Sequence, residues 1–155
     1  MKIRLAEASH AEAIKEFNKR MADETEGLQL NEQVLEDGVK AVFEGGGQGY
    51  LADKGFYLVA EDGEMIVGCL LITREWSDWR NAWFWWIQSV YVLPEYRGKG
   101  VYRRLYEFVK EEARRLGIIA GFRLYVEHDN YTAQQVYKKL GMSESHYLMF
   151  EELIK

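Results

Sequence analysis

Four cationic side chains and two glycines gather in one stretch of this chain, residues 94–106. Gly98 and Gly100 are separated by one residue, and apolar residues at helical spacing follow them. Glycines let a ligand approach the backbone, and the start of a helix presents unpaired N–H groups and partial positive charge. The pattern therefore predicts an anion site suited to phosphate or pyrophosphate. The cations beside it are Arg97, Lys99, Arg103 and Arg104.

A tight strand-to-helix turn with solvated charges is the competing interpretation of this loop, because a lone Gly-x-Gly pattern is weakly specific. Two familiar phosphate motifs do not fit. The nucleoside-triphosphate loop needs Ser or Thr after Gly98-Lys99, and Gly100 stands there. The dinucleotide fingerprint needs a third glycine, and Arg103 occupies its position. The loop is thus either a plain turn or a phosphate site of another kind.

Acidic residues and tryptophans in two other segments could bind a cation. Residues 21–28 place carboxylates at the end of a predicted helix, where they oppose the helix dipole and so indicate a tertiary role. Residues 74–81 combine acids with indole rings, which bind cations through ion pairs and cation–π contacts. The competing interpretation is solvated acids and tryptophans that anchor a turn. The candidate residues for binding a cationic amine are Glu24, Glu26, Glu75, Trp76 and Asp78.

Hydrophobic periodicity and turn signals predict a mixed α/β sheet in the order β-α-α-β-β-β-α-β-α-β. Asp62-Gly63 is the signal for a hairpin between two early strands. Residues 82–93 are apolar on both faces, which predicts a central strand leading into the glycine loop. Asn31 and Asn130 are predicted to begin helices, and a last strand is predicted over residues 145–153.

Composition narrows the class of protein. A length of 155 residues with 48% hydrophobic residues predicts a single domain over residues 1–155. The formal net charge of −5 argues against a nucleic-acid partner. The apolar runs are too short for a membrane span and the start lacks a signal peptide, so we expect a cytoplasmic protein with no membrane partner. One cysteine, and histidines without ligand spacing, predict no metal site.

A second motif follows the glycine loop. Residues 122–142 read FRLYVEHDNYTAQQVYKKLGM, and with SVYVLPEYRGKG at 89–100 they resemble the GNAT superfamily of acyl-CoA-dependent N-acetyltransferases. The resemblance is strong over residues 84–142, and the element order extends it to the GNAT fold of the whole chain. The second pattern of that family, N-x-x-A-x-x-(apolar)-Y-x-x-x-G-(F/M), is filled in register by Asn130, Ala133, Val136, Tyr137, Gly141 and Met142.

The resemblance implies a binding site for acetyl-CoA, without a metal. It implies that loop N–H groups hold the pyrophosphate and that the central strand pairs with the pantetheine arm and the acyl carbonyl. The implied coenzyme-binding residues are Val90, Tyr91, Val92, Arg97, Gly98, Lys99, Gly100, Val101, Tyr102, Arg103 and Asn130. Tyr137 matches the family's tyrosine that acts as general acid. The reaction needs such a group because amine attack on a thioester expels a thiolate, which a positioned O–H can protonate.

The implied reaction is acetyl transfer from acetyl-CoA to a primary amine, by direct attack in a ternary complex. We expect a small cationic acceptor such as a polyamine, a diamine or an aminoglycoside. A non-catalytic acyl-CoA sensor and a protein or peptide N-acetyltransferase remain alternatives, and a homodimer is left open. The chain departs from the family pattern at Glu95 and at Tyr102. Its central strand also lacks the usual catalytic carboxylate, so the base is Glu75, another carboxylate or water.

Overall fold

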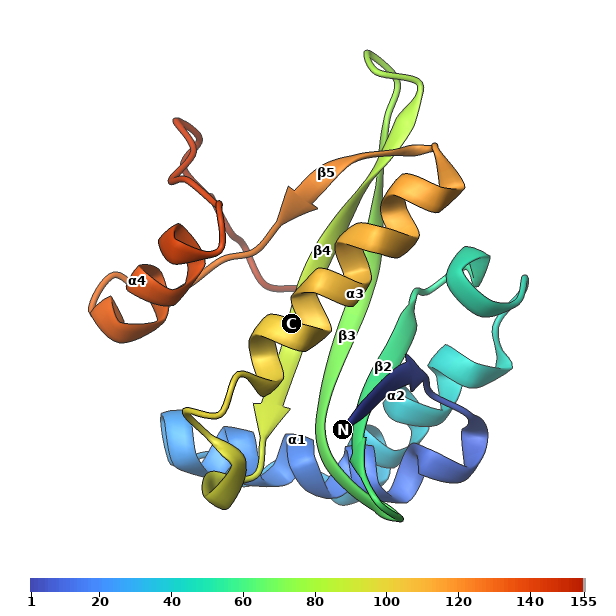
Figure 1. Ribbon diagram of the computed structural model, residues 1–155, viewed down its shortest axis with the longest axis vertical. Coiled ribbons are helices and arrows are strands. Elements are labelled where there is room, and N and C mark those ends of the chain that lie inside the picture. The colour runs from blue at the N-terminus through green and yellow to red at the C-terminus, as the bar shows by residue number, and fades with distance from the viewer. Residues whose placement is uncertain (155) are drawn as a thin grey trace. The chain divides into compact units, whose positions relative to one another are not determined.

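The structure is a computed structural model that describes residues 1–154. The chain divides into two compact units, Met1–Leu124 and Tyr125–Lys155 (Figure 1). No helix among the described residues is long and apolar enough to cross a bilayer. The predicted single domain over residues 1–155 stays a prediction.

The first unit contains a five-stranded mixed sheet in the order β1-β2-β3-β4-β5. Its strands are β1 Lys2–Leu5, β2 Phe56–Asp62, β3 Met65–Ser77, β4 Ala82–Val92 and β5 Ile119–Arg123. Neighbours pair antiparallel except β4 and β5, which are parallel. The predicted hairpin at Asp62-Gly63 joins β2 to β3, and the predicted central strand is β4, which pairs on both sides.

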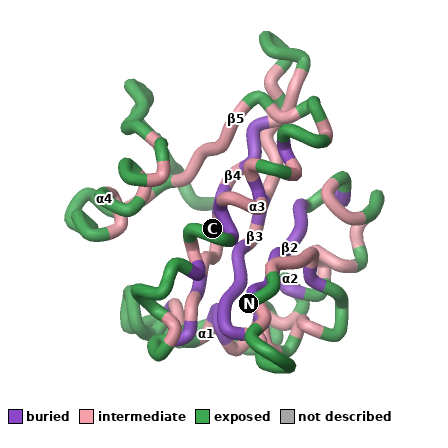
Figure 2. Tube along the Cα trace, in the orientation of Figure 1, coloured by how far each residue is buried: buried purple, intermediate pink, exposed green. Residues whose placement is uncertain are grey.

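Helices cover the two faces of this sheet. The helices of the first unit are α1 Ala11–Glu26, α2 Glu32–Glu44 and α3 Val101–Leu116, with short 3₁₀ turns η1 Ala8–His10, η2 Gly49–Leu51 and η3 Pro94–Tyr96. Phe56 and Tyr57 follow one another on β2 and so face opposite sides. Phe56 packs against Trp85 on one side, and Tyr57 stacks on Phe43 of α2 on the other. Figure 2 shows the buried residues concentrated in the central strands and along α3.

Local signals account for where α2 and α3 begin or end. The Asn31 Oδ1 atom accepts a hydrogen bond from the Val34 N–H at 3.0 Å and begins α2, as predicted. Gly117 ends α3 in the left-handed conformation, with a φ of 70°. Both boundaries need only neighbouring residues, which is why the sequence predicts the one at Asn31.

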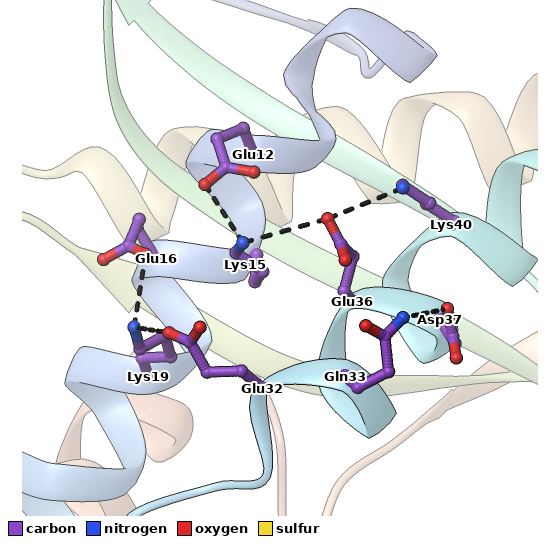
Figure 3. A network of polar contacts seen from close by, with 9 residues as sticks. All are labelled: Glu12, Lys15, Glu16, Lys19, Glu32, Gln33, Glu36, Asp37 and Lys40. Atoms are coloured by element: carbon purple, nitrogen blue, oxygen red, sulfur yellow. Dashed lines mark hydrogen bonds and ion pairs between the residues drawn. The ribbon is translucent and has the colours of Figure 1, made fainter.

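A ladder of alternating charges joins α1 to α2 (Figure 3). Lys15 of α1 lies 4.0 Å from Glu36 of α2 and 3.1 Å from Glu12. One turn later, Lys19 pairs with Glu32. Both lysines thus reach from one helix to the other, but partly exposed ion pairs of this kind contribute little to stability.

The second unit differs from the predicted end of the chain. It contains the helix α4 Tyr131–Lys139, and residues 143–154 form neither strand nor helix. The predicted last strand over residues 145–153 is therefore not formed. Apolar alternation gives a segment strand character, but a strand also needs a neighbour to pair its backbone groups, and this unit supplies none among its described residues.

We expect Leu105→Ala to lower the free energy of unfolding by about 2–5 kcal/mol. Leu105 of α3 is fully buried, and its loss leaves a cavity beneath the helix that follows the glycine loop. Urea denaturation measures the change, and Leu51→Ala, at a half-exposed leucine, is the control, with a change of about 0.5 kcal/mol. Equal effects of the two substitutions would contradict the packing of α3 described above.

Candidate functional site

The glycine loop ends at the N-terminus of α3. Gly98 and Gly100 have φ values of 75° and 80°, which residues with a Cβ rarely adopt. A Cβ built on either glycine meets no atom within 4 Å, so the space beside the loop is open. The first N–H groups of α3 have no acceptor inside the helix, and the helix dipole adds positive charge there. The loop thus has the local geometry of an anion site.

The cations beside the loop are not equally available to an anion. Arg103 donates to Glu107 at 2.9 Å, and Arg97 donates to Glu24 at 2.7 Å. The Lys99 ammonium lies 5.4 Å from the centre of the Tyr96 ring and makes no ion pair among residues 1–154. Two of the four predicted cations, Arg97 and Arg103, are therefore already paired with carboxylates. Arg104 makes no ion pair among residues 1–154, and its guanidinium donates to the Met1 carbonyl at 3.4 Å.

Strand β4 loses one of its neighbours before it reaches this loop. The parallel ladder with β5 ends at the pair Trp86–Arg123, whereas the ladder with β3 continues to Val92. Within the described sheet, the β4 edge beyond Trp86 has no strand beside it. An edge of this kind can pair with an extended ligand.

A bulge accompanies the divergence of the strands. Leu71 pairs with Gln88 and Cys69 with Tyr91, so two residues of β4 lie opposite one residue of β3. One of the two is Ser89, whose φ of 45° is unusual for a residue with a side chain. The bulge turns the strand immediately before the predicted coenzyme-binding segment Val90–Val92.

A groove of about 320 Å³ opens beside this bulge, between α1, α2 and the sheet. Its walls are largely apolar, and no carboxylate or cation lines it. Burial raises the pKa of Tyr57 to about 12, so its phenol is neutral at physiological pH. The amide nitrogen of Asn18 donates to the Ile14 carbonyl at 3.1 Å. The groove is lined by Asn18, Leu30, Val34, Val39, Tyr57 and Ser89, among others.

The predicted amine-binding acids lie at two separate places. Glu75 on β3 pairs in register with Phe84, whereas Glu24 contacts Tyr91, seven residues further along β4. At about 3.3 Å per residue, that separation is roughly 20 Å along the strand. In Figure 1 the β3–β4 hairpin lies at the top of the first unit and α1 at its bottom. Glu24 and Glu75 therefore do not line one pocket.

Both of these glutamates already have partners. Hydrogen bonds from Arg97 and Tyr91 lower the pKa of Glu24. Desolvation acts to raise the pKa of Glu75, but its hydrogen bonds outweigh that effect and lower it. These bonds come from the Trp86 indole N–H at 2.7 Å and from Arg123 at 2.9 Å. Each carboxylate is thus held ionised by groups of the protein itself.

The other predicted acceptor residues are more exposed. Trp76 is half-exposed and packs edge-on against Trp83, with ring centres 4.9 Å apart. Asp78 accepts the N–H of Trp79 at 2.8 Å in the hairpin turn. Glu26 lies at the exposed end of α1. Among residues 1–154, neither Glu26 nor Asp78 forms an ion pair, so their charges remain available.

The second unit holds the remaining predicted site residues. The Asn130 Oδ1 atom accepts the N–H of Ala133 at 3.2 Å and so begins α4. Tyr137 lies on the same helix, and burial raises the pKa of its phenol. Its hydroxyl therefore keeps its proton at physiological pH, as a general acid must.

Two other kinds of chemistry can be assessed from the structure. Among the described residues, no group of three or more His, Cys, Asp or Glu side chains is placed to hold a metal ion. Burial raises the pKa of Cys69 to about 12, and its side chain is almost completely enclosed. Because the thiolate is the reactive form of cysteine, Cys69 is a poor nucleophile.

Comparison with known proteins adds independent information. The family model for the acetyltransferase (GNAT) family matches residues 14–142. The solved structure of a possible acetyltransferase from Clostridium difficile 630 is 40% identical, with a TM-score of 0.90, over 99% of this chain and 97% of that one. The aminoglycoside N-acetyltransferase AAC(6')-Iy in complex with CoA has a TM-score of 0.72 over 99% of this chain and 100% of that one. At 17% identity, that likeness concerns the fold alone.

A curated relative gives a partial match. Thialysine N-epsilon-acetyltransferase from Mus musculus is 34% identical over 84 residues, which cover 53% of this chain and 47% of that protein. The match thus spans about half the length of that relative. Together with the similar solved structures, the observed sheet confirms the predicted mixed α/β fold class.

Proposed function

This chain belongs to the acetyltransferase (GNAT) family, and from that premise we propose that it transfers the acetyl group of acetyl-CoA to a primary amine of a small molecule. The observation that supports this most is that an open strand edge continues directly into the glycine loop. The open edge of β4 beyond Trp86 leads directly into the glycine loop at the N-terminus of α3. An extended thioester arm paired with that edge would direct its phosphates toward the helix N-terminus.

The proposal assigns the donor site to backbone more than to side chains. Val90, Tyr91 and Val92 pair with the pantetheine arm and the acyl carbonyl. N–H groups from Gly98 onward, through Val101, Tyr102 and Arg103, hold the pyrophosphate, with Lys99 adding charge. Asn130 contributes on the pantetheine side, as the family motif implies. Arg97 is the exception, because its own N–H donates to the Pro94 carbonyl at 3.2 Å and its guanidinium is bound elsewhere.

In the proposed reaction, a neutral amine attacks the thioester carbonyl, the C–N bond forms, and the C–S bond then breaks. The departing thiolate takes a proton from the Tyr137 hydroxyl. Burial raises the pKa of this phenol, so it is protonated at physiological pH, although the same shift makes it a weaker acid. The amine loses its proton to water or to a carboxylate. Glu75 is a weak candidate for this base because its lowered pKa reduces its basicity. The enclosed, protonated Cys69 favours direct attack over an acyl-cysteine intermediate.

We further propose that the acceptor is a small cationic amine, such as a polyamine, a diamine or an aminoglycoside. Glu26, at the end of α1, and Asp78, in the β3–β4 hairpin beside the exposed indoles of Trp76 and Trp79, support this as two alternative recognition sites. Each carboxylate has an available charge, but the two lie near opposite ends of β4, so one small amine would meet only one of them. The names of two relatives, which specify thialysine and aminoglycosides, agree with a small amine. The uncharged groove beside Ser89 offers room for the acceptor body close to the proposed position of the thioester.

An acceptor screen tests the proposal directly. Release of free thiol from acetyl-CoA is measured with a panel of polyamines, diamines, aminoglycosides, amino acids and short peptides. Turnover with small cationic amines is the expected result. Binding of acetyl-CoA without turnover on any acceptor would favour the sensor, and turnover on peptides alone would favour a protein acetyltransferase.

We expect Tyr137→Phe to lower kcat by about 10²–10⁴-fold, because the phenol no longer donates a proton to the thiolate. The dissociation constant for coenzyme A should change little. Steady-state kinetics and calorimetry measure the two quantities. Tyr131→Phe, at an exposed tyrosine of the same helix, is the matched control. An unchanged kcat in Tyr137→Phe, with chemistry shown to be rate-limiting, would remove Tyr137 from this role.

We expect Gly100→Ala to weaken coenzyme A binding roughly tenfold or more, because its Cβ enters the space where the phosphates are proposed to lie. The control is Gly117→Ala at the other end of α3. Both glycines have a positive φ and open space, so both substitutions should cost about 1–2 kcal/mol of backbone strain. Calorimetric titration measures the coenzyme A affinity of both variants, and only Gly100→Ala should lower it. Equal coenzyme affinity in the two variants would contradict the proposed site.

We expect one of the two substitutions Glu26→Gln and Asp78→Asn to raise the KM for the amine by roughly two- to fivefold, with kcat unchanged, because it removes the exposed charge that meets the ammonium group. The other should leave the KM unaltered, because the two acids lie too far apart to bind one small amine. Glu44→Gln, at an exposed acid at the end of α2, should leave KM unaltered. If neither substitution alters KM for any accepted amine, these acids do not recognise the acceptor.

A further inference from the structure

We propose that Glu24 is a positioning residue for the coenzyme loop, which holds Arg97 against the end of β4 and thereby keeps the loop in its binding shape. The inference rests on the proposed function of this loop as the coenzyme A site. It differs from the interpretation of Glu24 as an amine-binding residue, which depends on a carboxylate that is free to meet a cation.

The contacts of Glu24 occupy both of its carboxylate oxygens. The Tyr91 hydroxyl donates to Oε1 at 2.8 Å, and the Arg97 guanidinium donates to Oε2 at 2.7 Å. Arg97 lies 73 residues from Glu24 in the sequence. Each oxygen keeps a lone pair, but the negative charge of Glu24 is already paired with the Arg97 guanidinium, which weakens its attraction for an incoming ammonium group.

Arg97 is held from three directions. Besides its bond to Glu24, its Nε donates to the Val92 carbonyl at 2.9 Å, and its guanidinium carbon lies 5.2 Å from the centre of the Tyr91 ring. The guanidinium therefore bridges the last turn of α1, the end of β4 and its own loop. This arrangement directs the Arg97 charge toward a carboxylate of the protein.

The anchor for these bonds is rigid. Tyr91 is 4% exposed, and its ring packs against Phe17 of α1 with ring centres 5.2 Å apart. Glu24 and Arg97 themselves are partly exposed, and an exposed ion pair by itself contributes little. This pair instead contributes to the position of the loop entry, because a buried tyrosine and a strand carbonyl hold the two charged groups in place.

The position of Arg97 explains why its anchoring matters for the loop. Arg97 directly precedes Gly98, and the glycines at 98 and 100 have the largest conformational freedom of any residue type. A loop of this kind must be ordered before its N–H groups can converge on one anion, and ordering on binding weakens affinity. Fixing the Arg97 side chain orders the loop entry in advance.

The test measures coenzyme A affinity of the full chain by calorimetry, with kcat and amine KM measured in parallel. In Glu24→Gln, we expect the dissociation constant of coenzyme A to rise by about two- to tenfold, the effect of a side chain and a short loop losing their order. The kcat at saturating acetyl-CoA and the KM for the amine should stay unchanged.

The matched control is Glu112→Gln, which breaks another exposed Glu–Arg pair. Glu112 accepts from Arg115 at 2.6 and 2.8 Å near the far end of α3. Its loss should leave coenzyme affinity unchanged. Tyr91→Phe removes the second donor to Glu24 while keeping the buried ring, and it should weaken coenzyme binding in the same direction. It keeps the proposal testable if Glu24→Gln folds poorly.

A double-mutant cycle separates positioning from a general loss of stability. If Glu24 acts through Arg97, the pair Glu24→Gln with Arg97→Gln binds coenzyme A no more weakly than Arg97→Gln alone. Additive losses in the double variant would overturn the proposal, because they would mean that the two residues act independently.

Two other results would also overturn it. Unchanged coenzyme affinity with a raised amine KM in Glu24→Gln would make Glu24 an acceptor-binding residue. Tighter coenzyme binding in Glu24→Gln would mean that the released Arg97 is itself a phosphate ligand that Glu24 restrains. Failure of the unmodified protein to bind coenzyme A would instead overturn the proposed function, and this inference with it.

Discussion

The early end of the β4–β5 ladder is the constraint on which the rest of the site depends. Beyond the Trp86–Arg123 pair, β4 continues with β3 alone on one side and an edge on the other. Backbone N–H and C=O groups require partners, so such an edge is costly to bury and well suited to an extended ligand. The bulge at Ser89 and the glycine loop follow within the same stretch of chain. We therefore propose that strand edge, bulge and helix N-terminus form one continuous surface for the coenzyme.

Charge is distributed over this surface in matched pairs. Arg97 and Arg103 each face a glutamate, and Glu75 faces Arg123. The pairing leaves backbone dipoles, Lys99 and Arg104 to meet an anion. A site built from N–H groups is more rigid than one built from long cationic side chains, which lose rotamer freedom when they bind. The same pairing neutralises Glu24 and Glu75, so a cationic acceptor would meet Glu26 or Asp78 instead.

The sequence predicted those features of the fold that depend on near neighbours. Asn31 begins α2 and Asn130 begins α4 because each needs only the adjacent turn of helix. The two motifs identified the family, since they have a fixed spacing along the chain. The strand predicted at residues 145–153 is not formed, because pairing requires a second strand that alternation does not reveal. The separation of Glu24 from Glu75 was equally hidden, since it follows from the register of β3 on β4.

The sequence by itself therefore established the family resemblance, the mixed α/β class and a glycine loop that leads into a helix. These are properties of local backbone chemistry and of residue order. Only the tertiary structure showed that β4 diverges from β5, that Arg97 folds back onto Glu24, and that two predicted amine-binding acids are already paired. The reason is physical: a hydrogen bond between residues 73 positions apart forms only after the intervening helices and strands have brought them together, and no local pattern records it.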